Sequence, residues 1–334
     1  MGCFNDLTID VFLKICQYLT FTEFFRAFFG LQKRLDDAIR TSSLCINLSK
    51  AIDWLNLPSL PPVQCRSLIL SGLDLHSFQT MYSRLNFSSL QSLQLIKMNL
   101  LTLYSFIVKL PIHQLESIHI GRFTWQYYPK DLYRQIWTSL INALDGNRLR
   151  YLHLPYHVRY WNVEELTHAF PALRRASLEY ISVQQMLAFF ARTPNLRRFK
   201  ACIDSPHSDL FRHDVILSKL THLTLILQEE WSWREIQRLL NICPHLKSLT
   251  LKLQADQQAK NLLEPTAWQM LIEEKLPHLI FLRLQLDRMI VHPDFKNSSL
   301  ENRFHYSDYW WERRPYFHVI VKDIERNNAQ SIFI

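Results

Sequence analysis

A six-residue pattern with leucine or a similar apolar residue at positions one, four and six recurs nine times along this chain. The copies start at residues 65, 90, 115, 149, 173, 196, 220, 246 and 279. The intervals between these starts are 25, 25, 34, 24, 23, 24, 26 and 33 residues, which describes one unit length with two insertions. Such self-similarity indicates a repeat architecture, in which each unit buries its apolar face only against its neighbours.

Each repeat predicts a strand followed by a helix. Positions four and six alternate with polar positions and so face one side of a strand. Apolar residues at helical spacing follow two of the copies: Leu101, Tyr104, Val108 and Leu110 after the second, and Trp233, Ile236, Leu239 and Leu240 after the seventh. We expect these stripes to pack behind the strands. Proline two residues before the first leucine ends the helix in four units, at Pro171, Pro194, Pro244 and Pro277.

The repeated pattern resembles the leucine-rich repeat family over about residues 60–290. That resemblance implies an α/β solenoid with a parallel sheet on its concave side and helices on its convex side. The repeats are irregular, since Ala176 and Ala201 stand at leucine positions. A further alternating stretch, 317–324, predicts one more strand, and the nearby aromatic residues Tyr306, Tyr309, Trp310 and Trp311 are expected to cap the sheet.

A different periodicity occupies residues 4–40. Apolar residues form a helical stripe, and Thr20 to Glu23 is a capping-box pattern that predicts the start of a second helix. The segment LTIDVFLKICQYLTFTEFFRAFFGLQKRLDDAI resembles the F-box, with Thr8 in place of the usual proline and Leu35 where tryptophan is frequent. We therefore predict a three-helix F-box-like module in residues 1–45, and about nine irregular repeats with a C-terminal cap in 46–334.

The F-box resemblance implies a non-catalytic substrate-recognition subunit of an SCF-type ubiquitin ligase. The module would dock on a Skp-type adaptor, and through it on a cullin scaffold, while the repeats bind a target protein. The residues carried over as adaptor-binding are Leu7, Val11, Ile15, Leu19 and Phe24. The alternative is a leucine-rich repeat interaction scaffold without a ligase role, in which the N-terminal helices only cap the repeats.

Residues that would carry catalysis are not recognisable in the sequence. With five glycines, no phosphate-binding loop can be drawn. His153 and His157 flank Pro155 instead of sharing a helical face, and the six cysteines form no CxxC pair. The cysteines are expected to be reduced and mostly buried. We therefore predict a protein that is not an enzyme, with no catalytic residue, no metal and no cofactor.

Apolar runs and charge limit the partners and the compartment. Stretches without a charged residue are too short to span a bilayer, and the N-terminus has no secretory pattern. An intracellular protein, cytoplasmic or nuclear, is therefore expected, without membrane association. The net charge of +8 is spread along 334 residues without a Lys/Arg-rich run, so nucleic acid is not expected as a partner.

A target site is predicted on the polar side of the strands. Positions three and five of the pattern alternate with the buried leucines, and six of these eight positions in the fourth to seventh copies are charged or aromatic. They are Tyr151, His153, Arg175, Ser177, Arg198, Lys200, His222 and Thr224, of which all but Ser177 and Thr224 are taken as target-binding. The hypothesis is that they hold an acidic or phosphorylated segment. An ordinary solvated sheet face, partly neutralised by Glu179, is the alternative.

Overall fold

The chain forms two compact units, Met1–Pro155 and Tyr156–Ile334. The computed structural model describes residues 11, 14, 44–48, 63–72, 79, 82, 85–121, 129–154, 167–203, 216–228, 231–254, 264–287, 308–313 and 317–322. Both units are α/β, with parallel strands and with helices in the connections, an arrangement compatible with a solenoid-like fold.

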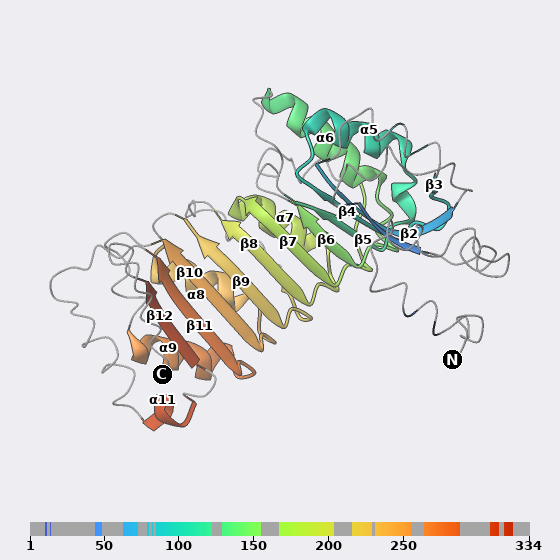
Figure 1. Ribbon diagram of the computed structural model, residues 1–334. Coiled ribbons are helices and arrows are strands. Elements are labelled where there is room, and N and C mark those ends of the chain that lie inside the picture. The colour runs from blue at the N-terminus through green and yellow to red at the C-terminus, as the bar shows by residue number, and fades with distance from the viewer. Residues whose placement is uncertain are drawn as a thin grey trace. The chain divides into compact units, whose positions relative to one another are not determined.

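In the first unit, parallel strands pair with one another in sequence order, and helices occur in the connections from one strand to the next (Figure 1). The strands are β1 (Leu44–Leu48), β2 (Val63–Ser71), β4 (Ser92–Ile96), β5 (Ser117–Ile120) and β6 (Tyr151–Leu154), and β3 (Leu85–Asn86) pairs with β2 beside this order. The helices are α5 (Leu100–Lys109), the 3-10 turn η3 (Ile112–Gln114) and α6 (Lys130–Ala143).

The second unit repeats the same construction. Its strands are β7 (Arg175–Ile181), β8 (Arg198–Ile203), β9 (His222–Leu227), β10 (Ser248–Gln254), β11 (Phe281–Asp287) and β12 (Phe317–Lys322). Neighbours in this order pair in parallel. The helices are α7 (Val183–Arg192), α8 (Trp233–Asn241), α9 (Pro265–Lys275) and α11 (Asp308–Arg313). In Figure 1, α8 and α9 lie behind the sheet, and none of the described helices covers its other face, which we call the open face.

All nine strands predicted from the repeated pattern are present, and each lies at its predicted position. In β4 to β11 each strand begins two residues after the first apolar residue of its repeat. The second residue of the repeat lies directly before the strand, and its backbone N–H can already bond to the preceding repeat. The Arg174 carbonyl, for example, accepts hydrogen bonds from the backbone N–H groups of Arg197 and Arg198, at 2.9 and 3.0 Å. The same pair of bonds recurs from one strand to the next and fixes the register across the unit.

The core of each unit lies between the strands and the helices. On β10, Leu249 and Leu251 are buried while Thr250 between them is half-buried, as the alternation predicts. Side-chain hydrogen bonds cap the starts of two of the helices that close the core of the second unit. Ser182 and Gln185 form a capping box at α7, and Ser232 and Glu235 form one at α8.

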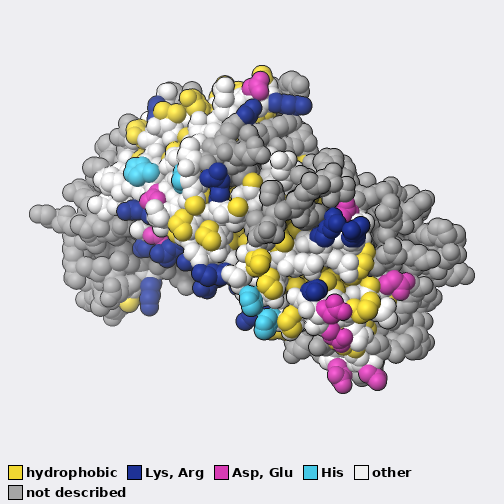
Figure 2. All heavy atoms as spheres, turned by 180° about the vertical axis from the view of Figure 1, so that it is seen from behind, with side chains coloured by type: hydrophobic (Ala, Val, Ile, Leu, Met, Phe, Trp, Pro, Cys, Tyr) yellow, Lys and Arg dark blue, Asp and Glu magenta, His cyan; other side chains and the backbone are white. Residues whose placement is uncertain are grey.

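The prediction for the face of α5 that packs was wrong. Leu101, Tyr104 and Val108 are 53, 47 and 65 % exposed, and Leu110 is the one member of that predicted stripe that is buried. The helix instead buries Leu100, Thr102, Leu103, Phe106 and Ile107. Figure 2 shows the resulting hydrophobic side chains at the surface over this part of the first unit. In α8 the predicted stripe does pack, since Ile236, Leu239 and Leu240 are buried and Trp233 is half-buried.

The core is well packed at the two positions where alanine replaces leucine. Ala176 and Ala201 are both buried, and Ala176 lies opposite Phe199 in the register of β7 and β8. The Phe199 ring meets Phe190 of α7 edge-on at a centroid distance of 4.8 Å. A large ring beside two small residues fills the volume that leucines fill elsewhere in the sheet.

At the C-terminal end, β12 confirms the strand predicted from the alternating stretch. Trp310 of α11 is buried and packs on Phe317 of β12, with ring centroids 5.3 Å apart, as expected of a cap. Tyr309 meets Trp310 edge-on at 5.1 Å. Tyr306 and the side chain of Trp311 lie outside the described residues.

At the N-terminal end, β1 pairs in parallel with β2 and spans the predicted module boundary at residue 45. This strand was not predicted. The predicted three-helix module falls almost wholly outside the described residues, which there include Val11 and Lys14, both helical and exposed.

Candidate functional site

The open face of the second unit carries the outward residues of its strands. The register places Arg175 of β7 opposite Arg198 of β8, and Arg198 opposite His222 of β9. One row further along, Lys200 of β8 lies between Ser177 and Thr224. Adjacent strands are about 4.8 Å apart, so the two guanidinium groups start from neighbouring backbone positions.

We call Arg175, Arg198, Lys200 and His222 the basic surface. The three Lys and Arg side chains are exposed, and His222 is half-buried. Residues that alternate with these side chains along the strands face the core, which directs the basic side chains outward. Phe199, for example, lies between Arg198 and Lys200 and is buried. The structure therefore brings together four of the six residues predicted to bind a target.

The field at this surface is positive. Burial, followed by the charges of Arg198, Arg175 and Lys247, lowers the pKa of His222 from its ordinary value. Among the residues that the structure describes, no carboxylate forms an ion pair with Arg175, Arg198 or Lys200. Glu179, predicted to neutralise part of the charge, is half-buried and stands four residues beyond Arg175, about 13 Å along an extended strand. An anionic group is thus the ligand that this surface favours.

Tyr151 and His153, the other two predicted target-binding residues, lie on β6 in the first unit. Both are half-buried, and the His153 ring stacks on His119 of β5 with centroids 4.1 Å apart. His119 occupies the fifth position of the third repeat. It was missed because outward positions were considered only from the fourth repeat on, and extending the same rule by one unit finds it.

Lys247 was missed for a different reason. It occupies the second position of its repeat, directly before β10, and it is exposed. The prediction treated only positions three and five as outward. The strand begins at position three, so the second position lies before it and does not follow the alternation of inward and outward side chains. The same omission applies to Arg197, which is also exposed.

Of the predicted adaptor-binding residues, Val11 is the one that the structure describes. It lies in a helical stretch and is 43 % exposed. Leu7, Ile15, Leu19 and Phe24 lie outside the described residues.

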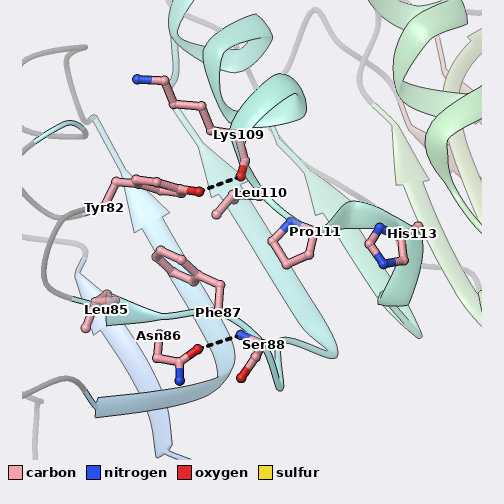
Figure 3. A pocket seen from close by; sticks show the side chains of 9 residues that line it. All are labelled: Tyr82, Leu85, Asn86, Phe87, Ser88, Lys109, Leu110, Pro111 and His113. Carbon is pink, nitrogen blue, oxygen red and sulfur yellow. Dashed lines mark hydrogen bonds between the residues drawn. The ribbon is translucent and has the colours of Figure 1, made fainter.

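A separate pocket of about 480 Å³ lies in the first unit, at the C-terminal end of α5 (Figure 3). The Tyr82 hydroxyl donates a hydrogen bond to the Lys109 carbonyl at 2.9 Å, which satisfies an acceptor that the helix end leaves free. The Tyr82 ring stacks on the Phe87 ring with centroids 5.6 Å apart, and the Lys109 Nζ lies 6.0 Å from the centre of the Tyr82 ring. None of the predicted site residues lines this pocket.

Three cysteines of the described residues lie in the core. Cys65, Cys202 and Cys243 are buried, as predicted for most of the cysteines, and burial raises the pKa of Cys243 to about 12. Within the described ranges, no three His, Cys, Asp or Glu side chains gather in a way that could hold a metal ion. None of the helices in those ranges is both long enough and apolar enough to cross a bilayer.

No protein-family model matches the chain, and no curated protein sequence matches it.

Proposed function

We propose that this chain is the non-catalytic substrate-recognition subunit of an SCF-type ubiquitin ligase. In this proposal the helical module of residues 1–45 docks on a Skp-type adaptor, and leucine-rich repeats in residues 46–334 hold a target protein. The observation that carries the proposal is the pairing of nine strand repeats with an F-box-like segment directly before them. The repeats offer an open, positively charged sheet face, which suits a binding module better than a catalytic one.

Adaptor binding rests on the apolar stripe of the N-terminal module. Burying an isoleucine side chain contributes roughly 1.5 to 3 kcal/mol, and placing a carboxylate there costs more. The Ile15→Asp substitution should therefore abolish co-purification of the adaptor. Gln17→Asp is the matched control, because in the predicted helix it introduces the same carboxylate on the side opposite to Ile15. Equal adaptor recovery with a folded Ile15→Asp protein would contradict the proposal.

Target binding rests on the basic surface. Arg175→Glu together with Arg198→Glu should release captured proteins at physiological salt while leaving adaptor binding intact. Arg134→Glu together with Arg234→Glu is the matched control, since Arg134 is exposed on α6 of the first unit and Arg234 is exposed on α8 of the second, so neither lies on a strand. A captured protein that both double variants retain equally is not held by the basic surface. If the wild-type chain captures targets but never an adaptor, the chain is an interaction scaffold instead.

A further inference from the structure

The starts of the strands in the second unit form a continuous line of residue pairs. The pairs are Arg174-Arg175, Arg197-Arg198, Thr221-His222, Lys247-Ser248 and Ile280-Phe281, from β7 to β11. Backbone hydrogen bonds of 2.8 to 3.0 Å join each pair to the next without interruption. The spacing between the pairs is thus set by the sheet itself.

The chemistry changes along this line from cationic to apolar. At one end, Arg175, Arg197 and Arg198 are exposed, whereas the Arg174 guanidinium donates to the Pro171 and Asn195 carbonyl oxygens and is held in place. Lys247, in the middle, is exposed. At the other end, Ile280 is 56 % exposed and Phe281 is half-buried.

An exposed isoleucine at this place is not required by the repeat. The same second position is polar or charged in the other strands of the unit: Arg174, Arg197, Thr221 and Lys247. More than half of the Ile280 surface is exposed, and this exposed apolar area is available to a partner.

We propose that the line of strand starts binds an extended peptide segment that carries an anionic side chain and, at a fixed distance, an apolar one. This inference rests on the proposed function, since it describes the target segment that the basic surface would hold. The anionic side chain, a carboxylate or a phosphate, pairs with Arg175, Arg197 and Arg198. The apolar side chain covers Ile280 and Phe281.

The sheet fixes the distance between the two determinants. From β8 to β11 there are three strand intervals, or about 14 Å, and an extended peptide advances about 3.3 Å per residue. The apolar residue should therefore stand about four residues from the anionic one, or five to six residues when the anion lies at β7. Spacings of one to three residues, about 3 to 10 Å, place the apolar group over Thr221 and Lys247, where it covers no apolar surface.

The test uses fluorescein-labelled peptides and fluorescence anisotropy with the full chain. Each peptide contains two glutamates, a Gly/Ser spacer and one leucine, and the leucine stands one, four or eight residues from the second glutamate or is replaced by serine. A parallel set carries phosphoserine in place of the first glutamate, which distinguishes phosphate from carboxylate as the anion. The four-residue peptide should bind about tenfold more tightly than the peptide without leucine.

Variants assign each end of the peptide to its surface. Ile280→Ser should remove the leucine advantage and leave the remaining affinity unchanged, while Arg198→Glu should weaken every peptide. Ile216→Ser is the matched control, because Ile216 is 69 % exposed elsewhere in the same unit. As a readout that needs no variant, the ¹³C-methyl signals of Ile280 should shift with the four-residue peptide and not with the one-residue peptide.

The outcomes separate this inference from the proposed function. If leucine has the same effect at every spacing, or Ile280→Ser keeps the full advantage, the two-part site is refuted. Arg198-dependent binding of the acidic part would in that case leave the proposed function standing. If no acidic or phosphorylated peptide binds the wild-type chain even at low salt, this inference and the target-binding part of the proposed function both fail, whereas adaptor binding is decided by Ile15→Asp.

Discussion

Replacement of Phe199 by alanine tests the packing that holds the basic surface in place. Phe199 is buried, contacts Phe190 edge-on at 4.8 Å and Phe189 at 6.1 Å, and lies opposite Ala176. Burial of the ring contributes roughly 2 to 3 kcal/mol, and aromatic pairs add about 0.5 to 1.5 kcal/mol. Ala176 is too small to fill the space that the Phe199 ring would leave. We therefore expect Phe199→Ala to lower the free energy of unfolding by about 3 to 5 kcal/mol.

The assay is urea and thermal denaturation followed by circular dichroism. For a unit of this size, each kcal/mol lowers the melting temperature by about 2 to 4 °C, so a decrease of roughly 6 to 20 °C is expected. Phe199→Leu keeps most of the volume and should cost about 1 to 2 kcal/mol. If Phe199→Ala lowers the free energy of unfolding by less than about 1 kcal/mol, the ring is not enclosed by the core. Burial of Phe199 would then not explain why Arg198 and Lys200 point outward.

Three further measurements test other parts of the structure. Ser232→Ala removes the side-chain oxygen that accepts from the Glu235 N–H at the start of α8, and it should cost about 1 kcal/mol in urea denaturation; an unchanged midpoint would contradict the cap. Leu103→Ala should cost about 2 to 5 kcal/mol and Val108→Ala less than about 0.5 kcal/mol, and the reverse order would contradict the orientation of α5. The folded chain holds the pKa of His222 below its ordinary value through burial and neighbouring cations, so it binds fewer protons than the unfolded chain near pH 6.5. The contribution of His222 to stability is then present above pH 6.5 and lost as the pH falls below it; His222→Gln should remove this part of the acid destabilisation, and an identical pH profile of the urea midpoint for both proteins would refute it.

The strand positions follow from the sequence because their signal is local. Alternating apolar residues determine which side of a strand faces the core, and the same six-residue pattern repeats nine times, so a weak copy such as that of Phe199 and Ala201 is placed by its neighbours. The outward direction of Arg175, Arg198, Lys200 and His222 follows from the same alternation. The basic surface was therefore predictable residue by residue within the second unit.

The packed face of α5 and the continuous line of strand starts were decided by the tertiary structure. The sequence LLTLYSFIVK is apolar on almost every side, so helical spacing alone offers several stripes, and packing in the folded unit buries Leu103 and Phe106 and leaves Tyr104 and Val108 exposed. The relation between Arg198 and Ile280 is equally invisible in the sequence, where they lie 82 residues apart. Interstrand hydrogen bonds between successive repeats bring them within three strand intervals of one another, because register is a property of the pairing and not of either strand.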